Sequence, residues 1–119
     1  MVETEKIRVI FEAGPLITSC RFYVGERPII DFVLEFCEII ITPSVKREVI
    51  DEGFRYPDAV LAGQKVKQGK IKVKGPLSAW DRILKAYKLG DGEIESILLL
   101  QESKSRIDYL VIDDNLAYL

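Results

Sequence analysis

The fold of this chain is decided by the stretch Glu38-Ile39-Ile40-Ile41-Thr42-Pro43. Its isoleucines form an almost continuous apolar run, which is typical of a strand that is covered on both faces of its sheet. Thr42 followed by Pro43 is typical of a helix start, with a threonine N-cap and proline at the first helical position. The stretch therefore predicts a buried strand that leads directly into a helix.

The flanking sequence continues this alternation in both directions. Short apolar or β-branched segments predict further strands, and helical spacing of apolar residues predicts helices. We expect a short helix to start at Leu16, behind Pro15. The remaining predicted strands cover 7–11, 71–73 and 108–112, and the remaining predicted helices cover 28–37, 43–53, 57–68, 77–87 and 93–103. Such alternation predicts an α/β fold over a single domain, 1–119, with three α/β/α layers around a central parallel sheet of about four strands.

The composition argues against several classes of protein. The chain has 119 residues, 48% of them hydrophobic, and a formal net charge of −2. Proteins that hold nucleic acid by general electrostatics are usually basic, so an RNA-binding role would need a local basic patch or a metal. The absence of histidine argues against structural zinc. We expect Cys20 and Cys37 to be reduced thiols, with a disulfide between them as the alternative. The sequence shows neither a signal peptide nor a membrane span, so we expect a cytoplasmic protein.

Acidic residues follow the predicted strands. Glu12 comes directly after the strand at 7–11, and Asp113 and Asp114 come directly after the strand at 108–112. Ligands of open α/β sheets bind outside the carboxyl ends of the strands. Because parallel strands end at the same edge, we expect these three carboxylates to lie there together.

Acids on two predicted helices can reach the same edge. Glu48 borders the apolar stripe of its helix, and Glu95 lies in a helix that is apolar almost all round, where a carboxylate is costly unless it is paired or bound to a cation. Asp91, four positions before Glu95, would repel it unless something neutralises both. Carboxylates gathered without histidine predict Mg²⁺ or Mn²⁺, which can orient and activate water for phosphodiester hydrolysis.

Each acid also has a purely structural interpretation. Asp91, Asp113 or Asp114 could cap a helix, and Glu93 could be a first-turn acid that the helix dipole favours. Glu48 could pair with a surface lysine, and Glu12 could belong to a turn. The functional interpretation depends on the arrangement of the acids and not on any one of them.

Four segments of the chain together resemble the PIN domain, the nuclease fold of toxin–antitoxin ribonucleases. They supply an acid after the first strand, a second acid in the following helix, a Gly-Glu-x-Glu form of the third motif and an acid after the last strand. The segments are 9–17 (Val-Ile-Phe-Glu-Ala-Gly-Pro-Leu-Ile), 41–49 (Ile-Thr-Pro-Ser-Val-Lys-Arg-Glu-Val), 89–97 (Leu-Gly-Asp-Gly-Glu-Ile-Glu-Ser-Ile) and 110–114 (Leu-Val-Ile-Asp-Asp).

The resemblance implies a Mg²⁺- or Mn²⁺-dependent endoribonuclease that acts on single-stranded RNA. It also implies a homodimer and an inhibitory antitoxin partner. The catalytic positions that it implies are Glu12, Glu48, Glu95, Asp113 and Asp114, and all of these except Glu48 would be metal ligands. No residue is an obvious general base, so the metal would activate the water.

Two departures from the family pattern favour an alternative function. The first acid is usually Asp, and in this chain it is Glu12, which carries one more methylene. Family members usually continue past the fourth motif with a further helix and strand, so we expect a shortened member. The alternative is therefore a catalytically weak PIN-like domain that binds RNA or a protein partner without cleaving.

Two other families fit less well. A Toprim-like domain also has Glu after its first strand, but it uses Asp-x-Asp where this chain has Asp113-Asp114-Asn115. A receiver domain would need paired acids early in the chain and a lysine late in it.

Lysines recur between residues 64 and 75, and they include Lys65, Lys67, Lys70, Lys72 and Lys74. They could contact RNA phosphates or a partner. We favour the alternative, in which they protect an edge strand from pairing with other chains.

Overall fold

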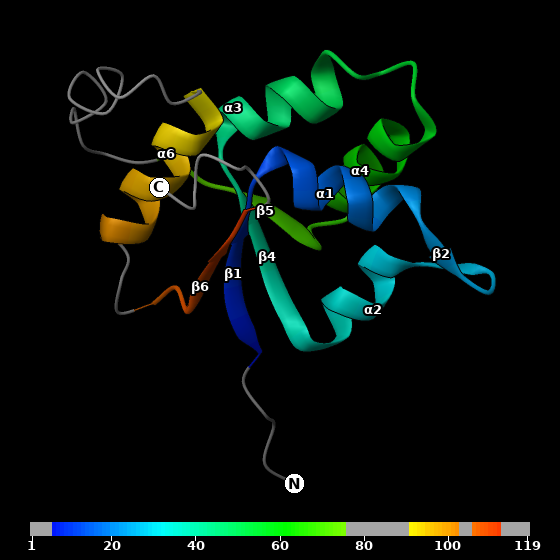
Figure 1. Cartoon of the computed structure of the whole chain (residues 1–119), viewed down its shortest axis with the longest axis horizontal. Helices are drawn as coiled ribbons and strands as arrows, with labels where there is room; N and C mark the ends of the chain where they lie inside the picture. Colours follow the sequence, from blue (N-terminus) through cyan, green and yellow to red (C-terminus); the bar gives the residue numbers. More distant parts are fainter. Residues whose placement is uncertain (1–5, 76–90, 103–105, 113–119) are drawn as a thin grey trace, which may run out of the picture.

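A parallel four-stranded sheet lies at the centre of the computed structural model, which describes residues 6–75, 91–102 and 106–112, the side chains of 91–93 excepted (Figure 1). The strand order is β5-β4-β1-β6, and every neighbouring pair is parallel. The strands are β1 (Ile7–Phe11), β4 (Cys37–Ile41), β5 (Ile71–Val73) and β6 (Tyr109–Val111). The predicted parallel sheet is confirmed.

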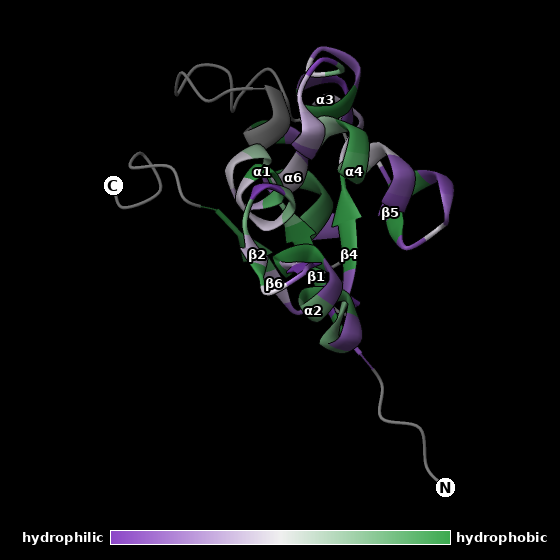
Figure 2. Ribbon diagram, turned by 90° about the vertical axis from the view of Figure 1, so that its right-hand side faces the viewer, coloured by the Kyte–Doolittle hydropathy of each residue, from purple (hydrophilic) through white to green (hydrophobic). Residues whose placement is uncertain are grey.

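Helices cover both faces of this sheet. Val9 and Phe11 of β1 pack into one core, together with residues of helices α1 (Ala13–Arg21), α2 (Ile29–Phe36) and α4 (Pro57–Lys67). Ile10 points to the opposite face, where it packs with Leu99 of helix α6 (Asp91–Glu102). Because successive side chains of a strand alternate between faces, β1 contributes to both cores. Figure 2 shows the apolar strands enclosed between the helices. The predicted α/β/α architecture is confirmed.

The predicted junction after the isoleucine run is present. Thr42 is the N-cap residue of helix α3 (Pro43–Lys46), and its side chain accepts a hydrogen bond from the backbone N–H of Val45. The helix then widens into a π-helix, η1 (Arg47–Asp51), in which the N–H of Glu52 bonds to the carbonyl of Arg47. This i to i+5 bonding is the part of the segment that the apolar spacing did not predict.

Gly53 follows η1, near the predicted end of the helix. A Cβ atom at this position would lie 2.4 Å from the carbonyl oxygen of Val49. The tight turn back toward the Val49 carbonyl, four residues earlier, therefore requires glycine here.

In the first third of the chain, one predicted helix start was wrong and one element was missed. The first helix begins at Ala13 and not at Leu16, because proline is tolerated in a first helical turn, where the N–H groups lack intrahelical partners. A small hairpin, β2 (Tyr23–Val24) paired with β3 (Arg27–Pro28), was not predicted. Gly25 begins its two-residue loop with a φ of 63°.

The lysine-rich segment includes strand β5, which lies at one edge of the sheet as expected. Lys72 on this strand makes an ion pair with Glu38 at 2.5 Å, and Lys65 on α4 makes one with Asp31 at 2.6 Å. Lys72 therefore pairs with the neighbouring strand β4, and Lys65 joins two helices. Protection of the sheet edge by the lysines stays a prediction.

The remaining sequence predictions concern cysteine, the membrane and the segment after β5. Cys20 and Cys37 are free thiols, as expected. No helix in the described part of the chain is long and apolar enough to cross a membrane. The helix predicted at 77–87 lies outside the described residues.

Candidate functional site

Glu12 lies at the carboxyl end of the central strand β1. It is the N-cap residue of α1, and only 7% of its surface is exposed. Its backbone N–H donates to the carbonyl of Val111 on β6 at 3.1 Å, and its carbonyl accepts from the N–H of Leu16. These bonds fix the residue where two neighbouring strands end, which is the edge that the sequence predicted.

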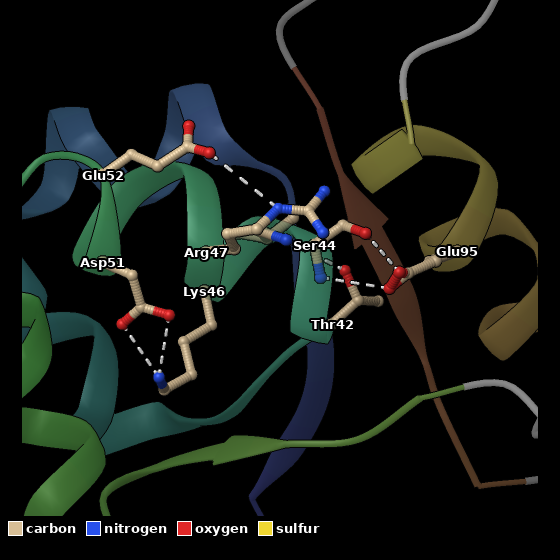
Figure 3. A network of polar contacts seen from close by, with 8 residues as sticks. Thr42, Ser44, Lys46, Arg47, Asp51, Glu52 and Glu95 are labelled. Carbon is tan, nitrogen blue, oxygen red and sulfur yellow. Dashed lines mark hydrogen bonds and ion pairs between the residues drawn. The ribbon is translucent and has the colours of Figure 1, made fainter.

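Glu95 contacts the start of helix α3. The backbone N–H of Ser44 donates to its Oε1 at 3.1 Å, and the Ser44 hydroxyl donates to its Oε2 (Figure 3). Ile94 and Leu98 on the same helix are buried. The cost of a carboxylate in this apolar helix is therefore offset by two hydrogen bonds from Ser44.

The start of α3 can supply these donors because the first N–H groups of a helix have no partner within it. The Thr42 side chain accepts a hydrogen bond from the backbone N–H of Val45, and Glu95 accepts one from the backbone N–H of Ser44. Thr42 and Ser44 are themselves buried. Since Thr42 directly follows β4, which neighbours β1, the Glu95 carboxylate lies at the same edge of the sheet as Glu12.

Glu48 is exposed on η1. Glu95, by contrast, is bonded to Ser44 at the start of α3. The predicted apolar stripe assumed α-helical spacing, and the wider π-helical turn changes which residues share a face with Val45 and Val49. The catalytic role of Glu48 stays a prediction.

The other predicted site residues lie outside the described part of the structure. Asp113 and Asp114 lie outside the described residues, and so do the side chains of Asp91 and Glu93. Among the side chains that are described, no three from Asp, Glu, Cys and His lie close enough together to hold a metal ion. The predicted metal-ligand set therefore stays a prediction.

The donor atoms at this edge fit a hard cation. Glu12 and Glu95 supply carboxylate oxygens, which Mg²⁺ and Mn²⁺ prefer as ligands. A carboxylate has about four lone-pair sites, so the two bonds from Ser44 leave sites on Glu95 for a cation.

Ser44 is the residue of this site that sequence reasoning missed. Its partner is 51 positions away along the chain. No local pattern identifies such a partner, and the short side chain after Thr42-Pro43 gives no other signal.

Comparison with known proteins identifies the family of this chain. A model of a PIN-domain family, DUF3368, matches residues 8–119. No curated protein and no solved structure gives a significant match. The matched range includes all the predicted acidic positions and nearly the whole chain, so this protein belongs to the PIN-domain family.

Proposed function

We propose that this chain is a Mg²⁺- or Mn²⁺-dependent endoribonuclease that cleaves single-stranded RNA. PIN domains are generally nuclease domains, and the family model covers residues 8–119. The observation that carries the proposal is the position of Glu12, a buried carboxylate at the carboxyl end of β1, beside the end of β6.

The proposed roles follow from this edge of the sheet. Glu12 and Glu95, with Asp113 and Asp114, would hold the cation, and Glu48 would assist from η1. The bound cation would supply positive charge for the phosphodiester and activate the attacking water. The carboxylates of the chain would orient the cation and balance its charge.

The test is cleavage of a mixed single-stranded RNA with Mn²⁺ or with EDTA. We expect the wild type to cleave only with Mn²⁺ and Glu95→Gln to be inactive, because an amide lacks the charge that the cation needs. Glu35→Gln is the matched control. It makes the same change in an exposed ion pair with Arg27 and should cleave normally. Absence of cleavage by a folded wild type, or cleavage that resists EDTA, would contradict the proposal.

The alternative is a PIN-like domain that binds RNA or a protein without cleaving. One feature favours it: Glu12 is one methylene longer than the Asp that usually stands at this position of the family. Displacement of the first carboxylate by a bond length could disturb a geometry to which catalysis is sensitive. RNA binding in a gel-shift assay without Mn²⁺-dependent cleavage would establish this alternative.

We also propose that the chain is toxin-like, with a homodimeric state and an inhibitory antitoxin partner. Large apolar side chains are exposed and available to partners. They include Phe22, Tyr23 and Val24 around the hairpin, and Phe54, Tyr56 and Val60 around the start of α4. Sedimentation equilibrium tests the dimer, and a monomer at micromolar concentration would contradict it. Growth arrest on induction of the wild type but not of Glu95→Gln tests the toxin role.

A further inference from the structure

The two hydrogen bonds from Ser44 fix both oxygens of a single carboxylate. We propose that Ser44 is a positioning residue, which holds Glu95 in the orientation that receives the divalent cation. This inference rests on the proposed nuclease function. It adds a residue that supplies no ligand atom of its own.

Ser44 is suited to this role because its own position is tightly constrained. It is 8% exposed, it follows the N-cap Thr42, and the ring of Pro43 restricts the backbone before it. These residues continue directly from β4, whose isoleucines are buried in the sheet. The donors on Ser44 are therefore held by the core of the domain.

Glu95 needs such support because its carboxylate ends a flexible side chain on a different element. Helix α6 packs on the opposite face of the sheet from α1 and α2. Without Ser44, the carboxylate could rotate about its own side-chain bonds relative to Glu12. With one donor on each oxygen, the plane of the carboxylate is set while other lone pairs stay open to a cation.

The chain offers a matched control one position away from Glu95. Ser96 is fully buried on α6, and its Oγ has no hydrogen-bond partner within the described part of the chain. Ser96→Ala and Ser44→Ala each remove one hydroxyl group from a buried serine. Only the second change removes a bond to Glu95.

The experiment is calorimetric titration of the full-length chain with Mn²⁺. Ser44→Ala should bind Mn²⁺ about 10- to 100-fold more weakly than the wild type, the usual effect of losing a residue that orients a metal ligand. Ser44→Thr, which keeps a hydroxyl, should recover most of the affinity, and Ser96→Ala should bind like the wild type. Thermal unfolding in EDTA shows whether each variant is folded.

The outcomes separate this inference from the proposed function. If the wild type binds Mn²⁺ and Ser44→Ala binds equally well, positioning by Ser44 is overturned and the nuclease proposal stands. If the folded wild type binds no Mn²⁺, both fall. Equal weakening in Ser44→Ala and Ser96→Ala would also overturn the positioning role, because it would reflect a general loss of packing.

Hydrogen exchange gives a second measurement that needs no substitution at Ser44. In EDTA, the Ser44 amide of the wild type should exchange roughly tenfold more slowly than that of Glu95→Ala, in line with the loss of one hydrogen bond. Equal exchange rates in two folded proteins would show that Glu95 does not engage this amide, and would overturn the inference.

Discussion

The ion pair between Lys65 and Asp31 should contribute more to stability than a typical pair on a protein surface. It joins α4 to α2 with an N–O distance of 2.6 Å, and the two side chains are only 11% and 28% exposed. The pair of Arg27 and Glu35 has nearly the same distance, 2.7 Å, but its side chains are 48% and 49% exposed. The two pairs therefore separate the effect of burial from that of geometry.

Burial sets the expected magnitudes. Exposed pairs contribute about 0.2–1 kcal/mol, whereas removal of one partner from a buried pair costs about 3–5 kcal/mol. Asp31→Ala should cost about 3 kcal/mol, because it leaves the more buried Lys65 ammonium without its counter-charge. Lys65→Met should cost less, about 1–2 kcal/mol, because Asp31 can still reach water.

Double-mutant cycles measured by urea denaturation test this reasoning. The coupling between Lys65 and Asp31 should be about 2 kcal/mol, intermediate between the exposed and buried limits. The coupling between Arg27 and Glu35 should be below about 1 kcal/mol. Equal coupling in the two pairs, or a smaller cost for Asp31→Ala than for Lys65→Met, would refute the argument from burial.

Three further predictions concern single residues. Burial raises the pKa of the Cys20 thiol from 9.0 to about 12. The free energy of unfolding should therefore fall between these pH values, because the unfolded chain loses the thiol proton first. Urea unfolding measured across this pH range should show a smaller fall for Cys20→Val than for the wild type, and an equal fall in both proteins would contradict the prediction. Gly53→Ala places a methyl group against the Val49 carbonyl and should cost about 1–3 kcal/mol in urea unfolding; an unchanged midpoint would contradict the close approach. A hydrogen bond from Lys72 is the main cause that lowers the pKa of Glu38. The ionised Glu38 should therefore stabilise the fold at neutral pH, and this contribution should be lost as the pH falls through the lowered pKa. In an NMR titration, Lys72→Met should return the pKa of Glu38 toward its usual value, and an unchanged pKa would count against the hydrogen bond.

The elements with strong apolar patterns were predictable from sequence. The strand predicted from the isoleucine run is present as Cys37–Ile41, and the helix predicted at 28–37 is present as Ile29–Phe36. In both segments, the spacing of the apolar side chains along the sequence already indicates whether the backbone is a helix or a strand. The sheet then follows, because consecutive parallel strands need helical crossovers.

The missed elements depend on backbone conformation rather than on burial. The hairpin strands contain two residues each, too few to show alternation, although Gly25 at the first loop position was a usable signal. The amino-acid composition of the π-helical turn at Arg47–Asp51 does not differ from that of an α-helix. Whether the backbone N–H groups there bond to the i−4 or the i−5 carbonyl depends on how α3 and its neighbours pack.

The candidate site was predictable at the level of the sheet edge. Glu12 lies at the carboxyl end of its strand because strand length and direction were readable from the sequence. The pairing of Ser44 with Glu95 was not readable, because it depends on how α6 packs against α3. Sequence patterns identify which end of an element a residue occupies, and packing decides which side chains meet there.

The position of β1 in the sheet has a consequence for protein synthesis. The backbone N–H of Arg8 bonds to the side chain of Asp108, one hundred positions further along the chain. A ribosome must therefore make about a hundred residues before β1 can acquire its β6 neighbour, and pairing over such a separation is slow. Until then, the nascent strand has an unpaired backbone edge that can associate with other chains. A prematurely terminated product that lacks β6 could not form the bond between Glu12 and Val111, so the carboxyl edge of the sheet is completed late in folding.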